Sequence, residues 1–288
     1  MVVDPAQERN PSSVQSLLRA LDLLEALGRR GDARLGELAD EVGLHPSTVH
    51  RLLGTLGSRG FITQDKKTGH YRLGYAVLAL AQDAGKSTGE LRAVARPHLD
   101  AIREACGETV NLVVLERGRA VCIEQAEGTR RVRMNMELGR GFSAHSVASG
   151  KAFLAFTKEW RAALGHDEPY DRLTPYTKVT AGELEAEFAA IRENGISLER
   201  EENEIGVTCI AAPVFSTSLA PVAAISVCAP TTRLLEMQAS LTRLLRRHVV
   251  ELSRQLGHSV LSPHEESGAR TLKSDVDRAL DPPRKGNP

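Results

Sequence analysis

The stretch "GLHPSTVHRLLGTLGSRGF", residues 43–61, decides the architecture of the first part of the chain. Its apolar residues recur at helical spacing, which predicts one buried helix face. They are Val49, Leu52, Leu53 and Leu56. Pro46 suits the first turn of such a helix, because its missing N–H would have no partner there. The opposite face carries polar side chains near the helix start, namely Ser47, Thr48, His50 and Arg51.

The sequence on either side of this stretch completes a larger motif. A helical pattern at 35–42 precedes it, and the short turn at 43–46 joins the two helices. An earlier pattern predicts a further helix with the apolar residues Val14, Leu17, Leu18, Leu21, Leu24 and Leu27. Strand-like runs at 61–64 and 70–73 enclose a five-residue loop of hairpin type. Together these elements predict a winged helix-turn-helix over residues 13–74.

Ionised side chains in the third helix and the hairpin are mostly basic. From His45 to Arg72 there are five cations and one acid, a net charge of +4 in a chain whose 37 basic and 37 acidic residues cancel. A basic recognition helix beside a basic wing is typical of proteins that bind double-stranded DNA. The residues expected to contact DNA are Ser47, Thr48, His50, Arg51, Lys66, Lys67 and Arg72. One such unit covers a single half-site, so a homodimer is expected.

Composition limits the kinds of partner and the cellular compartment to be expected for the protein. Aromatic residues make up 4% of the chain, which argues against a stacking surface for single-stranded nucleic acid. No apolar run reaches the length of a membrane span, and the N-terminus lacks a signal-peptide layout. A cytoplasmic protein without a membrane partner is therefore expected. In that reducing compartment, buried thiols rather than disulfides are expected for the four cysteines, Cys106, Cys122, Cys209 and Cys228.

Residues 75–260 combine helical and strand patterns. Helices are expected at 75–82, 91–106, from Ser149 onward, at 181–194 and at 231–256, and strands at 109–115, 120–125, 131–136, 209–216 and 221–228. This order predicts an α+β fold with helices packed on an antiparallel sheet. The polar ends at 1–12 and 261–288 are expected to be disordered. The sequence has no catalytic motif, phosphate loop or clustered metal ligands, so neither catalytic residues nor cofactors are expected.

The chain resembles IclR-type transcriptional regulators over residues 13 to about 257. The fragments "SVQSLLRALDLLEAL", "LADEVGLHPSTVHRLLGTL" and "YRLG" resemble the DNA-binding unit of that family. The fragments "GETVNLVVLERG", "HSVASGKAFLA", "ENEIGVTCIAAPVF" and "VAAISVCAP" resemble its effector-binding unit. The resemblance implies a linker helix at 75–90 and a GAF- or PAS-like effector-binding domain at 91–260. It also implies dimers, often paired into tetramers, that respond to small organic acids.

The same resemblance implies a set of effector-binding positions. They are Ala148, Ser149, Glu199, Val207, Cys209, Ser226 and Cys228. Backbone N–H groups of Ala148 and Ser149 would face a carboxylate. In the glyoxylate- and pyruvate-sensing members the positions of Glu199 and Cys228 are usually Asp and Ser. A longer acid and a poorer hydrogen-bonding group favour a different or larger ligand, such as one with an amide or amine.

Two hypotheses about function follow. The first is a ligand-responsive transcriptional regulator, more often a repressor, whose operator binding is modulated by a small organic-acid-like metabolite. The alternative is a metabolite-binding module or enzyme with a vestigial helix-turn-helix. Plainer interpretations stay open for single residues: Cys209, Ser226 and Cys228 as small core residues, and Glu199 as a helix-end or surface carboxylate.

Overall fold

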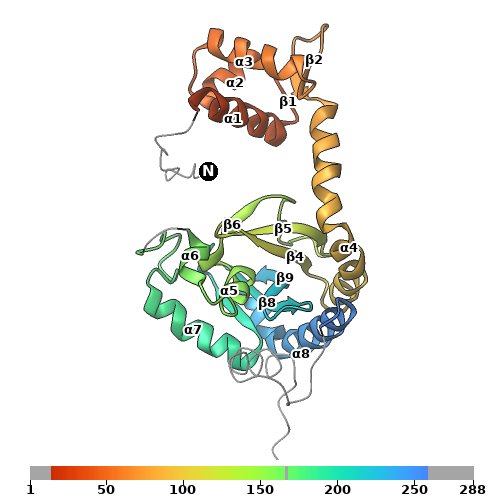
Figure 1. Ribbon diagram of the computed structural model, residues 1–288, viewed down its shortest axis with the longest axis vertical. Coiled ribbons are helices and arrows are strands. Elements are labelled where there is room, and N and C mark those ends of the chain that lie inside the picture. Colours follow the sequence, from red (N-terminus) through yellow and green to blue (C-terminus); the bar gives the residue numbers. More distant parts are fainter. Residues whose placement is uncertain (1–13, 166–167, 259–288) are drawn as a thin grey trace, which may run out of the picture. The chain divides into compact units, whose positions relative to one another are not determined.

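The computed structural model describes residues 14–165 and 168–258, and Figure 1 follows the chain through them. Contacts between residues divide the chain into two compact units, with the division between Ser87 and Thr88. The expected disordered ends, 1–12 and 261–288, lie outside the described residues. Within the described part, no helix combines the length and the apolar character that crossing a membrane requires.

The N-terminal unit is the winged helix-turn-helix that the sequence predicts. Its helices are α1 (Gln15–Arg30), α2 (Leu35–Val42) and α3 (Pro46–Ser58). Its strands are β1 (Asp32–Ala33), β2 (Ile62–Gln64) and β3 (Tyr71–Leu73), which pair antiparallel in the order β1-β3-β2. Gly43 ends α2 in the left-handed conformation, with φ of 63°, which glycine adopts without steric cost. Strand β1 was not predicted, because two residues are too short to show a period.

The core of this unit confirms the predicted face of α3 and, on α1, only the last two residues of the predicted pattern, Leu24 and Leu27. Val49 and Leu53 are buried, and Leu52 and Leu56 pack against the same cluster. On α1 the residues Leu23, Ala26 and Leu27 are fully buried. The predicted stripe begins with residues that are 39–63% exposed, namely Val14, Leu17, Leu18 and Leu21. Helix α1 therefore has a second apolar surface that its own unit does not cover.

Helix α4 (Tyr75–Cys106) corrects the expectation of two separate helices at 75–82 and 91–106. The apolar pattern is interrupted by the polar residues 82–90, "QDAGKSTGE", which suggested a break. Helical hydrogen bonding depends on the backbone and continues through a polar surface segment, so the loss of pattern did not end the helix. Pro97 lies within this helix.

The C-terminal unit contains a six-stranded antiparallel sheet, as expected. Its strands are β4 (Thr109–Glu116), β5 (Arg119–Ala126), β6 (Gly141–Ser143), β7 (Ser197–Arg200), β8 (Val207–Phe215) and β9 (Pro221–Pro230). Their spatial order is β6-β5-β4-β9-β8-β7. The prediction of a strand at 131–136 is wrong. That segment is irregular and is held by side chains: Thr109 Oγ1 donates to the Met134 carbonyl at 2.6 Å, and Gln125 Nε2 to the Met136 carbonyl at 2.9 Å.

Several helices follow α4 in the C-terminal unit. They are α5 (Ala148–Leu154), α6 (Trp160–Leu164), α7 (Ala181–Asn194) and α8 (Thr231–Gln255), and a short 3₁₀ turn, η1 (Ala144–Ser146), precedes α5. Helix α8 packs on β8 and β9, and α5 packs on the same two strands and on β7 (Figure 1). The sheet surface beside α5 carries small residues, including Ala211 and Ala224. Small side chains leave room there for a pocket.

Candidate functional site

Helix α3 presents the four polar residues that the sequence predicts for DNA contact. Ser47, His50 and Arg51 are exposed, and Thr48 is partly buried. His45 precedes the helix, and its Nδ1 accepts the backbone N–H of Ser47 at 3.3 Å and lies 2.8 Å from the Ser47 hydroxyl. The start of the helix is therefore ordered by a local cap, and its polar face is open to a partner.

The wing carries the other three predicted DNA contacts. Lys66 and Lys67 are exposed in the loop between β2 and β3, and Arg72 is exposed on β3. Asp65 shapes the loop, because its Oδ1 accepts the backbone N–H groups of Lys67 at 2.7 Å and Thr68 at 3.3 Å. These hydrogen bonds lower the pKa of Asp65. The acid of the wing is thus held by its own turn, and the two ammonium groups remain at the surface.

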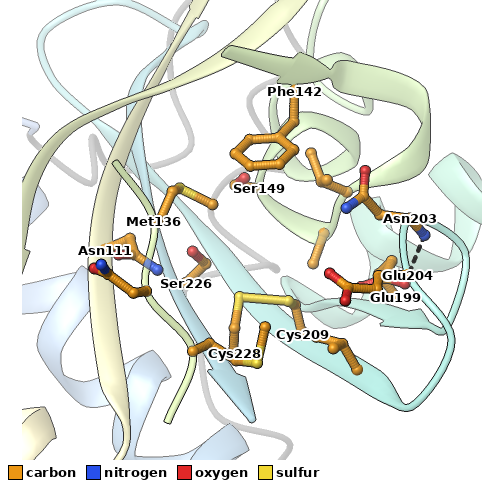
Figure 2. A pocket seen from close by; sticks show the side chains of 15 residues that line it. Asn111, Met136, Phe142, Ser149, Glu199, Asn203, Glu204, Cys209, Ser226 and Cys228 are labelled. Atoms are coloured by element: carbon orange, nitrogen blue, oxygen red, sulfur yellow. Dashed lines mark hydrogen bonds between the residues drawn. A yellow bond between two sulfur atoms is a disulfide. The ribbon is translucent and has the colours of Figure 1, made fainter. Parts of the chain in front are cut away.

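One pocket in the C-terminal unit contains all seven residues that the resemblance implied (Figure 2). They are Ala148 and Ser149 at the start of α5, Glu199 on β7, Val207 and Cys209 on β8, and Ser226 and Cys228 on β9. The empty volume is about 620 Å³, part of it open to solvent. Binding by these residues stays a prediction.

Other residues line the pocket that the sequence did not indicate. They are Asn111, Met134, Asn135, Met136, Phe142, Val147, Asn203 and Glu204. Phe142 lies across the space from the sulfur atoms of Cys209 and Cys228 (Figure 2). Met134 to Met136 belong to the segment that was expected to be a strand. Asn111 is a polar residue within a largely apolar strand, and this is the one sequence feature that could have indicated one of these additional pocket residues.

Five residues that line the pocket, Asn111, Glu199, Cys209, Ser226 and Cys228, belong to two rows of residues that face each other across neighbouring strands. One row across β7, β8, β9 and β4 holds Glu199, Cys209, Cys228 and Thr109. The adjacent row holds Ser197, Ala211, Ser226 and Asn111. Opposed residues, and residues two apart on a strand, point to the same side of a sheet. Antiparallel pairing therefore gathers side chains from distant parts of the sequence on one surface.

Ser226 is a buried hydroxyl without an internal partner. The residue is 1% exposed, and its Oγ accepts or donates no hydrogen bond within the described residues. Such a group costs about 1–3 kcal/mol relative to a paired one. Its neighbour Asn111 is already engaged, since its Oδ1 accepts Gln125 Nε2 at 2.9 Å. A molecule in the pocket that pairs with Ser226 would remove this cost.

Glu199 is a buried acid rather than a surface carboxylate, being 1% exposed. Its Oε1 accepts the backbone N–H groups of Glu202 at 2.5 Å and Asn203 at 3.3 Å. Burial raises the pKa of Glu199 to about 7, although these hydrogen bonds and the charge of Lys151 act in the opposite direction. The protonated and ionised forms are both populated near neutral pH. The group can therefore donate a proton to an acceptor or accept a hydrogen bond from a donor.

A buried ion cluster supports the turn that holds Glu199. Lys151 on α5 is fully buried, and its Nζ lies 2.6 Å from Glu187 Oε1 and 2.7 Å from Glu202 Oε1. Glu202 also supplies the closer of the two backbone N–H groups that bind Glu199. Burial raises the pKa of Glu202, against the effect of Lys151. Lys151 thus fixes the acidic turn without lining the pocket.

Cys209 and Cys228 form a disulfide, so the expectation of free thiols is wrong for this pair. They oppose each other on β8 and β9, with their Cα atoms 4.2 Å apart. They are separated by 19 residues in the sequence, and only strand register brings them together. Cys106 and Cys122 are free and buried, as expected.

Two domain families match the chain. The IclR helix-turn-helix domain matches residues 16–66. The C-terminal domain of the bacterial transcriptional regulator IclR matches residues 86–254. The two matches cover α3, with its four predicted DNA contacts, and every residue that lines the pocket.

Individual proteins are similar along most of the chain. The DNA-binding transcriptional repressor YiaJ of Escherichia coli is 36% identical over 262 residues, covering 88% of this chain and 93% of the relative. The crystal structure of Thermotoga maritima IclR has a TM-score of 0.70 at 29% identity, covering 85% of this chain and 99% of that one. An IclR homolog from Microbacterium hydrocarbonoxydans, complexed with 4-hydroxybenzoate, has a TM-score of 0.69 at 25% identity, covering 84% and 98%.

Proposed function

This chain belongs to the IclR family of bacterial transcriptional regulators, and from that premise we propose that a small organic-acid-like metabolite in the pocket modulates its binding to operator DNA. Like its family and curated relatives, it is a DNA-binding regulator rather than an enzyme. The observation that carries the proposal is the unpaired, buried Ser226 hydroxyl in the pocket. We infer a repressor, since YiaJ is one, acting in the cytoplasm where the operator is.

In this proposal, DNA is contacted by the polar face of α3 and by the wing. Arg51 is placed to read a base edge, and guanine is the base that arginine binds most often. Ser47, Thr48 and His50 contact base edges or phosphates beside it. Lys66, Lys67 and Arg72 bind phosphate groups, which strengthens binding without regard to sequence.

The pocket would bind an organic acid through neutral groups. Among the described residues that line it, none is a lysine, arginine or histidine. Ser149, Ser226 and the side-chain amides of Asn111 and Asn203 supply hydrogen-bond donors. Glu199 in its protonated form adds another donor, as buried carboxylic acids near neutral pH can. Support for a ligand of this class comes from the Microbacterium homolog, whose ligand is 4-hydroxybenzoate.

The charge on Glu199 distinguishes this ligand class from one that bears an amine or amide. A carboxylate ligand accepts from protonated Glu199, so its affinity falls as pH rises through about 7. An amine-bearing ligand pairs with ionised Glu199, so its affinity rises over the same range. The two classes therefore have opposite pH dependences.

Thermal-shift measurements at pH 6 and pH 8 test this proposal. The panel is pyruvate, glyoxylate, 4-hydroxybenzoate and small ureide- or amine-bearing acids, because a ligand that binds only the folded state raises the melting temperature. We expect Ser226→Ala to abolish the shift that a binding compound produces. Ser197→Ala is the matched control, since Ser197 is also buried and unpaired but does not line the pocket. A shift that survives Ser226→Ala unchanged would contradict the assigned site.

We propose a homodimer as the DNA-binding form. The exposed apolar surface of α1 consists of Val14, Leu17, Leu18 and Leu21. Contiguous exposed apolar side chains on a folded unit commonly mark an interface. A second copy of the same surface would cover them and supply the second half-site reader. Pairing of dimers into a tetramer is a further expectation of the family resemblance.

A further inference from the structure

We propose that the Cys209–Cys228 disulfide opens and re-forms in the folded protein by exchange with small thiols, and that its state alters operator binding. This inference rests on the proposed function of the pocket. It reconciles a disulfide with a protein expected in a reducing compartment, where disulfides that persist are commonly transient or redox-sensing.

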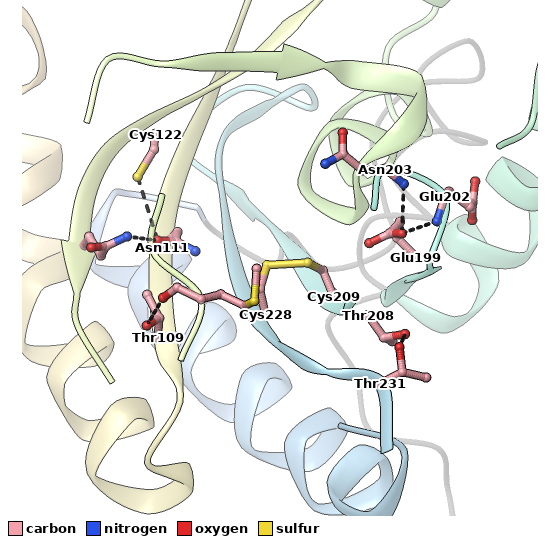
Figure 3. Close-up of a disulfide and its surroundings, with 12 residues drawn as sticks. Thr109, Asn111, Cys122, Glu199, Glu202, Asn203, Thr208, Cys209, Cys228 and Thr231 are labelled. Carbon is pink, nitrogen blue, oxygen red and sulfur yellow. Dashed lines mark hydrogen bonds between the residues drawn. A yellow bond between two sulfur atoms is a disulfide. The ribbon is translucent and has the colours of Figure 1, made fainter. Parts of the chain in front are cut away.

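The disulfide is part of the pocket wall. Cys209 and Cys228 both line the pocket and are 8% and 6% exposed. In the row of opposed residues they lie between Glu199 on β7 and Thr109 on β4 (Figure 3). A small thiol that enters the pocket can therefore reach the sulfur atoms, whereas a bulky protein surface cannot.

The other two cysteines are unsuited to exchange with this pair. Burial raises the pKa of Cys122 to about 12, and burial also raises the pKa of Cys106. Cys122 Sγ is engaged with the carbonyl of Glu124 at 3.4 Å. The attacking species in exchange is a thiolate, which these two groups do not form at neutral pH. Since the chain has four cysteines in all, the pair reacts only with thiols from outside.

The exchange is a balanced two-electron reaction. A thiolate of a dithiol attacks one sulfur of the pair, the S–S bond breaks, and the other cysteine leaves as a thiolate that takes up a proton. The second thiol of the reagent, deprotonated, then attacks the mixed disulfide and releases the first cysteine. The protein gains two S–H groups, and the dithiol becomes a cyclic disulfide. A disulfide oxidant of low molecular mass reverses these steps.

Reduction changes the pocket without separating the strands. Residues of β8 and β9 pair along the whole ladder, from Val207 opposite Pro230 to Phe215 opposite Pro221, so the strand positions do not depend on the disulfide. Two sulfur atoms that are no longer bonded need van der Waals separation, and the space open to them is the pocket. The thiols then occupy part of the ligand's volume and add weak donors beside Glu199 and Ser226.

Thiol counting on the native full-length chain is the first test. The protein is equilibrated without denaturant in reduced dithiothreitol or in oxidised glutathione. It is then acid-quenched, unfolded and alkylated for mass spectrometry. For the oxidised sample, oxidised glutathione is used instead of cyclic dithiothreitol, because the cyclic disulfide is too weak an oxidant to re-form a labile pair. We expect two alkylated cysteines after oxidation and four after reduction, and the two cysteines that change should be Cys209 and Cys228. Four free thiols under both conditions, or reduction only after unfolding, would overturn the proposal.

Operator binding is the second test. Fluorescence anisotropy measures the affinity of both redox forms for the DNA upstream of the protein's own coding sequence, with a scrambled fragment for comparison. Since coupling between sites is typically fivefold or more, we expect the two forms to differ by at least about fivefold. Cys228→Ser should match the reduced form under both conditions. Cys106→Ala, the matched control, should keep the difference.

The outcomes separate the two proposals. Specific binding that is equal in the two redox forms of the wild-type chain rejects the redox inference and leaves the regulator proposal intact. Absence of preference for the upstream fragment over the scrambled one, in both forms, rejects the proposed DNA recognition itself. The wild-type comparison decides these outcomes even where a cysteine variant fails to fold.

Discussion

Glu199 illustrates how burial changes the chemistry of a single residue. Its pKa is about 7 in the folded protein, against an ordinary value of 4.5. Between these two pH values the folded protein holds a proton that the unfolded chain has released. The group therefore favours the folded state most below pH 4.5, and this contribution is lost as the pH rises to 7. Above pH 7 the folded protein contains a buried charge that the turn of Glu202 and Asn203 only partly stabilises.

Glu199→Gln should remove this pH dependence. Glutamine keeps an oxygen that accepts the two backbone N–H groups but cannot ionise. We expect the variant and the wild type to be similarly stable near pH 4.5, and the variant to be more stable by a few kcal/mol at pH 8. Urea unfolding at a series of pH values measures this difference. Glu204→Gln, at an exposed residue on the pocket rim, is the control and should give a constant difference.

At the scale of elements, short segments determine where functional side chains lie. The wing is a two-strand hairpin whose turn is held by one aspartate. The start of α5 is set by its contact with η1, where Gly150 lies against the backbone of Ala144. Each segment is small enough for one substitution to alter it.

The wing lysines should determine the salt dependence of DNA binding. The double variant Lys66→Ala, Lys67→Ala should bind operator and non-operator DNA more weakly, and to the same extent. The magnitude of the slope of log K against log salt should fall by about 2, since each phosphate contact contributes about 0.9. Arg51→Ala should instead reduce the preference for the operator. Lys158→Ala, an exposed lysine of the other unit, is the control. A slope unchanged by the double variant would remove the wing from the interface.

Gly150→Ala should destabilise the C-terminal unit. A Cβ atom there would lie 2.7 Å from the carbonyl carbon of Ala144, a backbone contact that cannot be relieved by a side-chain rotation. We expect a loss of about 1–3 kcal/mol, typical of overpacking, and loss of ligand-induced thermal shifts. Gly182→Ala, near the start of α7, has no atom within 4 Å of its Cβ and should be neutral or stabilising. Calorimetry on both variants measures the contrast.

At the scale of the molecule, each unit has its own core and its own site. The helix-turn-helix core and the pocket cluster share no residue. A ligand in the pocket can alter DNA binding only if it binds one arrangement of the molecule more tightly than another. The uncovered apolar surface of α1 is the feature through which we expect two copies to associate.

Leu17→Glu with Leu21→Glu should disrupt this association. Charged side chains on the α1 surface are readily hydrated in the monomer but costly to bury between two copies. Light scattering after gel filtration should give two or four times the 31.2 kDa chain mass for the wild type and a lower mass for the variant. Val132→Glu, at a residue 67% exposed in the other unit, should leave the mass unchanged. An unchanged mass for the double variant would place the interface elsewhere.

Local patterns in the sequence by themselves determined the helices, most strands and the basic surface of the winged helix-turn-helix. These features depend on side-chain period, turn residues and charge within short segments, all of which a sequence displays directly. The family resemblance added the positions of the seven pocket residues.

Only the tertiary structure decided which of these residues meet and in what state. Strand register paired Cys209 with Cys228, burial shifted the pKa of Glu199, and the pocket left Ser226 without a partner. The tertiary structure also decided which apolar residues of α1 are buried, and it left Leu17 and Leu21 exposed. Contacts between residues far apart in the chain depend on the packing of whole elements, which local sequence patterns do not specify.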